Sequence, residues 1–161
     1  MKNLYLLVFL FSQFILLNSC SSSNAVVSHN SDIAKYKYVV FGKEPTGDRE
    51  LDDIVMLIEN EIANKFKVVS AQKGLELLNS GEFILSPSIN VKSEKWDGGH
   101  TYITINFHDY DTNRSIAVIK SSGIGLTVSH DQKIALNAIR KKLNKIFKSY
   151  VSIRLSTLYQ T

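Results

Sequence analysis

The pattern of apolar and polar residues along the chain predicts helices and strands in turn. Over 48–66 the apolar positions advance by threes and fours, which places them on one stripe of a helix. Asp48 is a suitable N-cap, and acidic residues follow it where the helix dipole favours negative charge. We expect an amphipathic helix whose buried stripe consists of Leu51, Ile54, Val55, Ile58, Ile62 and Phe66.

A second amphipathic pattern occupies 129–150. Ser129 followed by Gln132 matches a capping box and predicts the start of this helix. After it, apolar residues alternate with polar ones over 151–158, so this segment either continues the helix or adds an edge strand. The apolar side of the helix is formed by Ala135, Ile139, Leu143, Ile146, Phe147 and Tyr150.

Shorter apolar segments predict the elements between the two long helices. The segment 101–108 alternates strictly, with Ile103, Ile105 and Phe107 on one face, which indicates a half-buried strand. A polar turn and a returning strand over 115–121 complete a hairpin. The other elements are strands over 36–41, 67–69 and 83–92, the last with Pro87 at an edge or bulge, and a helix over 71–79 between Ser70 as cap and Gly81 as terminator.

The predicted order is strand, helix, strand, helix, three strands, helix. This order favours an α/β (α+β) fold: a single layered domain over 34–161, with a small mixed sheet and about three helices. Because the segment 20–33 is rich in serine and lacks periodicity, we expect a flexible tether there.

The N-terminus has the features of an export signal. Lys2 precedes an apolar run over 4–17, which as a helix would span about 21 Å, less than the roughly 30 Å of a bilayer core. The closing tetrapeptide Leu17-Asn18-Ser19-Cys20 resembles the bacterial lipoprotein signal. An ordinary signal peptide cut nearby and a retained membrane anchor are the alternatives.

The lipoprotein resemblance implies that Cys20 accepts a diacylglycerol and becomes the mature N-terminus after removal of 1–19. Cys20 is the single cysteine of the chain, so it has no partner for an internal disulfide. Two or more acyl chains anchor a protein stably. The implied location is the bacterial cell envelope, with the lipid in a membrane, by expectation the outer membrane.

The element order and several short sequence segments resemble a group of small bacterial envelope lipoprotein domains over 36–147. The group includes the CsgG-type periplasmic domain and LpoB-type activators of cell-wall synthases. The resemblance implies a fold and an envelope setting, with no catalytic residues. CsgG has long membrane-spanning hairpins, but the hairpin segments here are too short and too polar to form them, so a secretion pore is not implied. The segments that carry this resemblance are Val68-Val69-Ser70, Leu77-Leu78, Gly81-Glu82-Phe83-Ile84-Leu85, Ile105-Asn106-Phe107-His108-Asp109 and Tyr110-Asp111-Thr112-Asn113.

Neither catalytic nor metal-binding motifs stand out in the sequence. The histidines show no HExxH motif, and no GxSxG elbow is present. His108 and Asp109 are adjacent in a predicted strand and should point to opposite faces, which argues against cooperation between them. His130 is expected to be exposed at the start of the last helix. We therefore predict no enzymatic activity, no metal and no cofactor.

Two surfaces could bind a partner. A turn with two glycines carries Trp96, His100 and Tyr102, which either contact a sugar or protein partner or include a Trp folded back on the core. The last helix has a basic face, which either contacts an anionic surface or is only solvated. Its cations are Lys133, Arg140, Lys141, Lys145 and Lys148.

The net charge of +4 is too small to indicate a nucleic-acid-binding protein. Two classes of function remain. The first is a non-enzymatic envelope module that binds an envelope protein or a second copy of itself. The second is a periplasmic ligand-binding or hydrolase domain with a pocket between sheet and helices. It requires a concave site with convergent polar groups, whereas the first predicts no such pocket.

Overall fold

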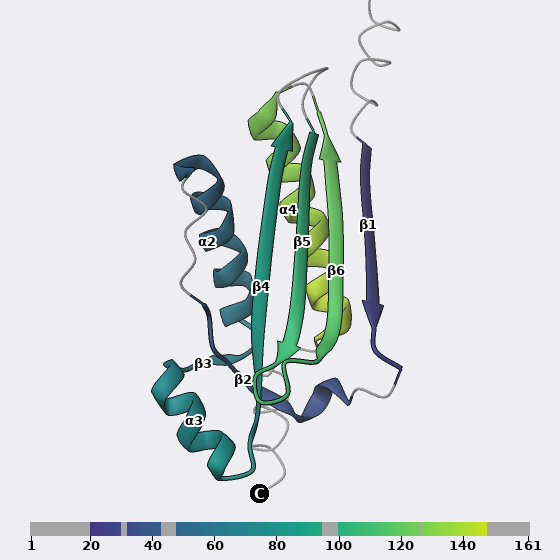
Figure 1. The fold of residues 1–161 in the computed structure, drawn as a ribbon. Helices are drawn as coiled ribbons and strands as arrows, with labels where there is room; N and C mark the ends of the chain where they lie inside the picture. The colour runs from purple at the N-terminus through teal and green to yellow at the C-terminus, as the bar shows by residue number, and fades with distance from the viewer. Residues whose placement is uncertain (1–19, 30–31, 43–47, 95–99, 126, 148–161) are drawn as a thin grey trace, which may run out of the picture.

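The fold is a six-stranded mixed sheet with its two long helices on one face and a short helix against one end of the other face (Figure 1). The computed structural model describes residues 20–29, 32–42, 48–94, 100–125 and 127–147. The strand order is β1-β6-β5-β4-β2-β3. The strands are β1 Cys20–Val27, β2 Tyr36–Val39, β3 Lys67–Val68, β4 Phe83–Glu94, β5 His100–Asp109 and β6 Ser115–Ile124, and the helices are η1 Ile33–Lys35, α2 Arg49–Ala63, α3 Ala71–Asn79 and α4 Val128–Ile146.

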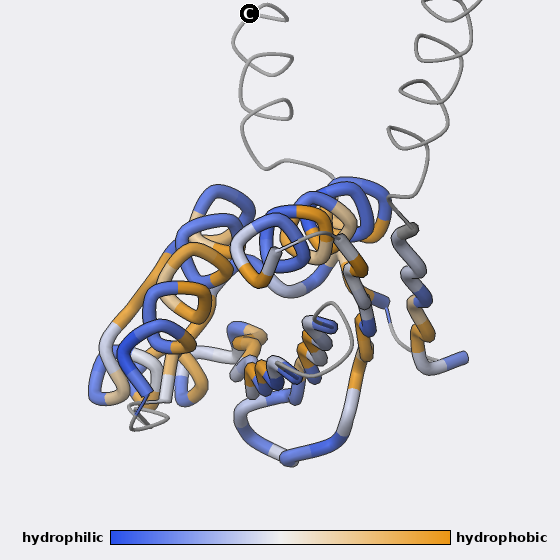
Figure 2. Tube along the Cα trace, turned by 90° about the horizontal axis from the view of Figure 1, so that it is seen from above, coloured by the Kyte–Doolittle hydropathy of each residue, from blue (hydrophilic) through white to orange (hydrophobic). Residues whose placement is uncertain are grey.

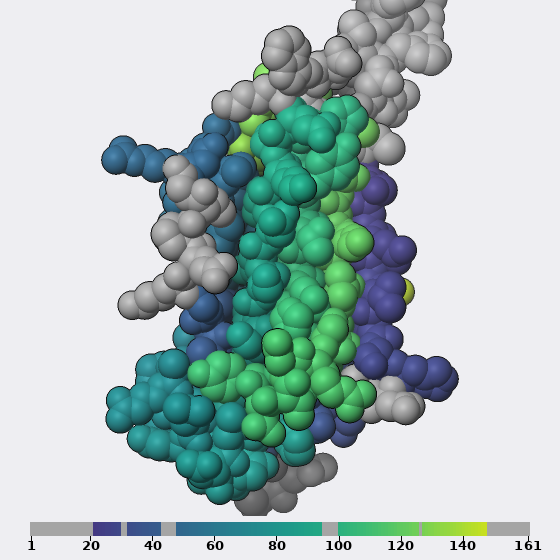
Figure 3. All heavy atoms as spheres, viewed as in Figure 1, coloured from purple at the N-terminus to yellow at the C-terminus, as the bar shows by residue number. Residues whose placement is uncertain are grey.

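The sheet has two regions of different pairing. Strands β1, β6, β5 and β4 are antiparallel neighbours, whereas β2 runs parallel to both β3 and β4. Helices α2 and α4 lie on the same side of the sheet (Figure 2). Helix α3 lies on the opposite face, where Gly74 packs against Val40 and Ile84, and within the described residues no helix covers that face over β1, β6 and β5 (Figure 3). This arrangement confirms the predicted single α+β domain.

The core lies between the sheet and helices α2 and α4. On β5 the predicted inner residues Ile103, Ile105 and Phe107 are 1% exposed or less. Phe147, just after α4, packs edge-on against both Phe66 and Phe107, with ring centroids 4.9 Å apart in each pair. Aromatic and aliphatic side chains of this size each contribute about 1.5–3 kcal/mol when fully buried. The two helices supply Ile54, Ile58, Ile62, Ala135, Ile139 and Leu143.

Local signals in the sequence determine most of the element ends. The Asp48 carboxylate accepts a hydrogen bond from the Glu50 amide at 3.0 Å at the start of α2. Ser70 caps α3 in the same way, and Gly81, with φ +79°, follows the end of that helix. These predicted caps and this terminator are confirmed.

Pro87 is tolerated in β4 because of where the ladder to β2 ends. The pairing of β2 with β4 extends only to Leu85, so beyond that residue β4 has a strand neighbour on one side, β5. A proline needs such a position because it has no amide hydrogen for a second neighbour. The prediction of a local edge at Pro87 is confirmed.

Helix α4 begins earlier than predicted. Thr127 is the N-cap, and its hydroxyl accepts a hydrogen bond from the His130 amide at 3.3 Å. Gln132 donates instead to the Glu50 side chain on α2, at 2.8 Å. The predicted capping box of Ser129 and Gln132 is therefore wrong, because Thr127 holds the N-cap position. The predicted segment 151–158 lies outside the described residues.

The largest difference from the predictions is at the N-terminal end of the described chain. Residues expected to form a flexible tether instead form β1, which pairs along its whole length with β6, from Cys20 opposite Ile124 to Val27 opposite Ala117. The prediction of a flexible tether is wrong for these residues, because an edge strand is held mainly by its backbone hydrogen bonds. A run of serines supplies these bonds as well as apolar residues do. The folded domain therefore includes Cys20, the first residue of β1.

Candidate functional site

A cleft of about 550 Å³ opens at the end of the sheet where η1, β2, the C-terminal end of α3 and the β5–β6 turn meet. This is the lower end of the molecule in Figure 1. Its lining carries charges of both signs: Lys35 and Arg114 are cations, and Glu82 and Asp111 are acids. The cleft thus combines a concave shape with several polar groups, as ligand and partner sites do. The sequence predicted such a site for a ligand-binding or hydrolase domain and none for a non-enzymatic module, so the cleft departs from the expectation for the module.

Asp109, at the last position of β5, holds one wall of the cleft together. One carboxylate oxygen accepts hydrogen bonds from the Asp111 amide at 3.2 Å, the Thr112 amide at 2.9 Å and the Thr112 hydroxyl at 3.0 Å. The other oxygen accepts the hydroxyl proton of Tyr36, on β2, at 2.7 Å. The carboxylate therefore ties the β5–β6 turn to the parallel part of the sheet.

An aromatic pair also lines the cleft. The rings of Tyr36 and Phe83 meet edge-on, with centroids 5.9 Å apart. The ammonium group of Lys35 lies 3.8 Å from the centroid of the Phe83 ring, within the range of a cation–π interaction. These contacts fix the cation beside the cleft, where it can meet an anionic or carbonyl group of a bound molecule.

The electrostatics of the Tyr36–Asp109 pair suit a structural role. Burial raises the pKa of the Tyr36 hydroxyl far above its ordinary value, and the bond to Asp109 and the charge of that carboxylate raise it further. Burial also raises the pKa of Asp109, but the hydrogen bonds from Thr112, Tyr36 and Asp111 outweigh it, so the net pKa is lowered. At neutral pH the tyrosine stays protonated and the carboxylate ionised, which leaves neither group ready for acid–base exchange.

We expect acid to weaken the fold partly through Asp109. Because its pKa is lower in the folded chain, the carboxylate stabilises the fold above its unfolded pKa of about 3.9, and this stabilisation is lost as the pH falls through the folded pKa. Urea unfolding at a series of pH values below 5 should show a smaller acid-induced loss in Asp109→Asn than in the wild type. Equal losses in both proteins would contradict this account.

The histidines do not enter the cleft. His108 lies on the open face of β5, half-buried, while Asp109 is buried on the other face, as their adjacency predicted. His130 is exposed in the first turn of α4, also as predicted. Among the described residues no group of three or more His, Cys, Asp and Glu side chains could hold a metal ion.

The predicted loop surface is described only in part. Trp96 lies outside the described residues. His100 and Tyr102 stack on the open face with ring centroids 6.1 Å apart, and the Tyr102 side chain is exposed. This pair lies at the opposite end of β5 from Asp109. The loop and the cleft are therefore separate surfaces.

The basic face of α4 is present, but Arg140, one of its cations, is held in an ion pair. The Arg140 guanidinium contacts the Glu61 carboxylate of α2 at 2.7 Å and so joins the two helices. Lys133, Lys141 and Lys145 are exposed. Lys148 lies outside the described residues. Of this predicted surface, three lysines remain exposed for an anionic contact.

A row of buried polar side chains lies beneath the start of α4. Ser93 pairs with Thr101 across β4 and β5, and Thr101 pairs with Gly123 of β6. Asp131, fully buried in the first turn of α4, lies against Gly123 and Gly125. Its carboxylate accepts no hydrogen bond within the described chain.

Sequence reasoning identified neither Asp109 nor Tyr36 as a site residue. The Asp-Tyr-Asp-Thr-Asn turn was recognisable, and an aspartate is well suited to accept amide hydrogen bonds from the next residues of a turn. However, the tyrosine that completes the site is 73 positions away in the sequence. No local pattern joins the two, so only the pairing of the strands reveals the cleft.

Comparisons with known proteins give a fold likeness but no family. No family model matches the chain, and no curated protein matches it. Among solved structures, a PDZ domain protein from Parabacteroides distasonis is similar at 11% identity, with a TM-score of 0.50. The match covers 88% of this chain but 40% of that protein. At this identity the likeness concerns the fold alone.

Two crystal structures of the PelC dodecamer from Paraburkholderia phytofirmans, one of them a point variant, also match. Their identities to this chain are 12% and 17%, and their TM-scores are 0.43 and 0.41. Each match covers 77% of this chain and 96% of the PelC chain.

Proposed function

We propose that this chain is a membrane-anchored bacterial lipoprotein that acts as a non-enzymatic binding or assembly module of the cell envelope. The observation that carries the proposal is Cys20, placed directly after an apolar run and the residues Leu17-Asn18-Ser19. The anchoring membrane is by our proposal the outer membrane. Within the part of the chain that the structure describes, no helix is both long and apolar enough to cross a bilayer.

The cleft is the surface to which we assign partner binding. Charges of both signs line it, so a polar segment of an envelope protein or of a second copy could be held by complementary contacts. The Tyr36–Asp109 pair keeps the walls in place, which reduces the ordering cost of binding. A rigid, polar and concave surface suits recognition.

A second candidate function is the binding of a small polar ligand in the same cleft. Its support is the volume of about 550 Å³, which is within the range of small-molecule sites. The two candidates differ in what is captured: a protein that copurifies, or a small molecule that stabilises the purified domain. We favour ligand binding over hydrolysis in this cleft. The Asp109 carboxylate already accepts four hydrogen bonds, so it is not free to activate a water molecule.

Cys20→Ala tests the anchoring directly. We expect the wild type to fractionate with membranes and to carry a diacylglycerol on a mature N-terminus that begins at Cys20, because the thiol is the acceptor of the lipid. The variant should be exported poorly or stay uncut. Mass spectrometry of the N-terminal peptide and membrane fractionation measure both outcomes.

Ser21→Ala is a matched control, since it changes the neighbouring residue and leaves the thiol in place. It should be processed and anchored like the wild type. A Cys20→Ala variant that is cut and released as efficiently as before would contradict lipidation. Affinity purification of the anchored protein from its own envelope, with the variant in parallel, then identifies the partner that depends on anchoring.

A further inference from the structure

The structure leaves no spacer between the proposed lipid site and the folded domain. Cys20 is the first residue of β1, and its backbone is already paired with Ile124 of β6. A lipid on this residue would therefore be attached to the end of the sheet itself. A flexible linker of a dozen residues would have let the domain move by roughly 20 Å, but the pairing of β1 removes that freedom.

The register of the strands defines which end of the domain is nearest the lipid. Cys20 is aligned with Ile124, Ile124 with His100, and His100 with Glu94, so one row across four strands marks this end. The N-terminal residues of α4 lie close to it, since Asp131 is against Gly123. We call this row of four residues, Cys20, Ile124, His100 and Glu94, the anchored end.

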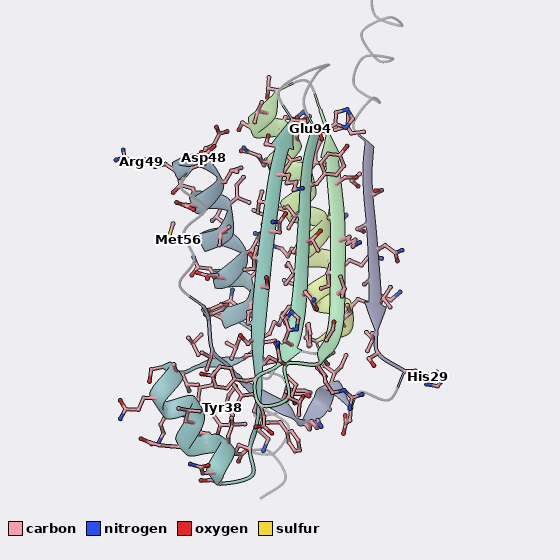
Figure 4. The ribbon with its side chains drawn as sticks, viewed as in Figure 1. His29, Tyr38, Asp48, Arg49, Met56 and Glu94 are labelled. Atoms are coloured by element: carbon pink, nitrogen blue, oxygen red, sulfur yellow. The ribbon has the colours of Figure 1, made fainter. Side chains whose placement is uncertain are left out.

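The cleft is at the other end of the same strands. From His100 to Asp109, β5 advances nine residues, or roughly 30 Å at 3.3 Å per residue. His29, just after β1, also lies at this far end, opposite Glu94 (Figure 4). The anchored end and the cleft are thus separated by the length of the sheet.

Two other orientations on a membrane conflict with this geometry. If the domain lay on the basic face of α4, the helix would hold the sheet about one helix diameter, roughly 10 Å, above the lipid surface. Cys20 is itself the first residue of β1, so no linker residue is present to span this distance. To lie on the edge of β1, the domain would bring the unpaired backbone groups of that edge against lipid, where they lose water as a hydrogen-bonding partner.

We propose that the lipidated domain stands on the bilayer with the anchored end against the lipid headgroups and the cleft facing away, roughly 30 Å from the membrane. This inference rests on the proposed lipidation of Cys20. It assigns the membrane surface as the partner of the anchored end and leaves the cleft open to a partner in the aqueous compartment. The basic face of α4 then points sideways.

The orientation is measurable by energy transfer on vesicles. Lipidation uses the single native thiol, so an added cysteine is the one free site for a donor dye. Three exposed positions report on three orientations: Glu94→Cys at the anchored end, His29→Cys at the far end of β1, and Lys141→Cys on α4. The acceptor is a dye on the headgroups of phosphatidylethanolamine and phosphatidylglycerol vesicles.

We expect transfer to be strongest from Glu94→Cys, intermediate from Lys141→Cys and severalfold weaker from His29→Cys. Equal transfer from Glu94→Cys and His29→Cys would show that the strands lie along the bilayer, on the β1 edge or on the open face of the sheet, and would overturn the proposal. The strongest transfer from Lys141→Cys would show the α4 face on the membrane and would overturn it as well. A protein without the diacylglycerol by mass would instead overturn the proposed function on which this orientation rests.

A spacer insertion checks that the short connection causes the orientation. Six Gly and Ser residues placed between Cys20 and Ser21 would add a reach of roughly 13 Å and should reduce the transfer from Glu94→Cys toward that from His29→Cys. Far-UV circular dichroism and the mass of the lipidated terminus show that folding and anchoring survive the insertion. Unchanged transfer in a folded, lipidated insertion variant would support the orientation but would show that contact of the anchored end with the headgroups, and not the short connection, sets it.

Discussion

Replacing Asp109 by alanine should lower the free energy of unfolding by about 3–4 kcal/mol. The substitution removes an acceptor that binds two amides and two hydroxyls, three of them in the β5–β6 turn and one from Tyr36. Hydrogen bonds to a charged group each contribute about 1.5–3 kcal/mol, although bonds that share one acceptor do not add fully. Urea unfolding followed by far-UV circular dichroism measures the loss.

Two further variants separate the contribution of the Asp109 carboxylate from that of the residues around it. Tyr36→Phe removes one of the four bonds and should cost about 1–2 kcal/mol. Asp111→Ala alters an exposed side chain in the same turn and should stay within about 0.5 kcal/mol of the wild type. If Asp109→Ala were no more costly than Asp111→Ala, the carboxylate would not be the tie between the turn and β2.

The elements that the sequence predicted well are those whose signals are local. On α2, Ile54, Ile58 and Ile62 recur every four residues and are all buried, so the apolar stripe alone located the helix and its inner face. On β5 the alternation of Ile103, Ile105 and Phe107 did the same for a strand. In both cases one face meets the core and the other meets water, which is the condition that makes a periodic pattern visible.

Strand β1 was missed because its stability comes from β6. Half of its residues are serine or asparagine, and Val26 is 63% exposed, so its sequence shows no apolar face typical of a strand. The pairing from Cys20 opposite Ile124 onward is a contact across about a hundred residues of sequence. Composition predicts disorder for such a segment, but backbone pairing at a sheet edge overrides composition.

Part of the candidate site was also predictable from local sequence signals, and part depends on long-range pairing. The turn around Asp109 was predicted, whereas its connection to Tyr36 depends on β2 and β4 running parallel, which brings an early strand beside the end of β5. The proposed envelope location rests on the N-terminal signal, which is a feature of the sequence alone. The resemblance to CsgG-type and LpoB-type domains stays a prediction.

Replacing Gly123 by alanine should cost about 3 kcal/mol, because there is no space for a methyl group between β6 and α4. A Cβ at this position would lie 2.2 Å from the Asp131 carbonyl oxygen and 2.7 Å from the Ala135 amide nitrogen. Both are backbone atoms of α4, so the helix itself must move off the sheet. That movement also strains the hydrogen bond from the Ser121 hydroxyl to the Ala135 carbonyl, 3.2 Å long.

Gly42→Ala is the matched control for this substitution. No atom lies within 4 Å of a Cβ added at Gly42, so the same change of residue is expected to be neutral or slightly stabilising, through the lower entropy of the unfolded chain. Thermal unfolding of the two variants should therefore give shifts that differ in size and in sign. Equal shifts would mean that the contact of Gly123 with α4 does not limit stability, and that the helix can move away from this end of the sheet at little cost.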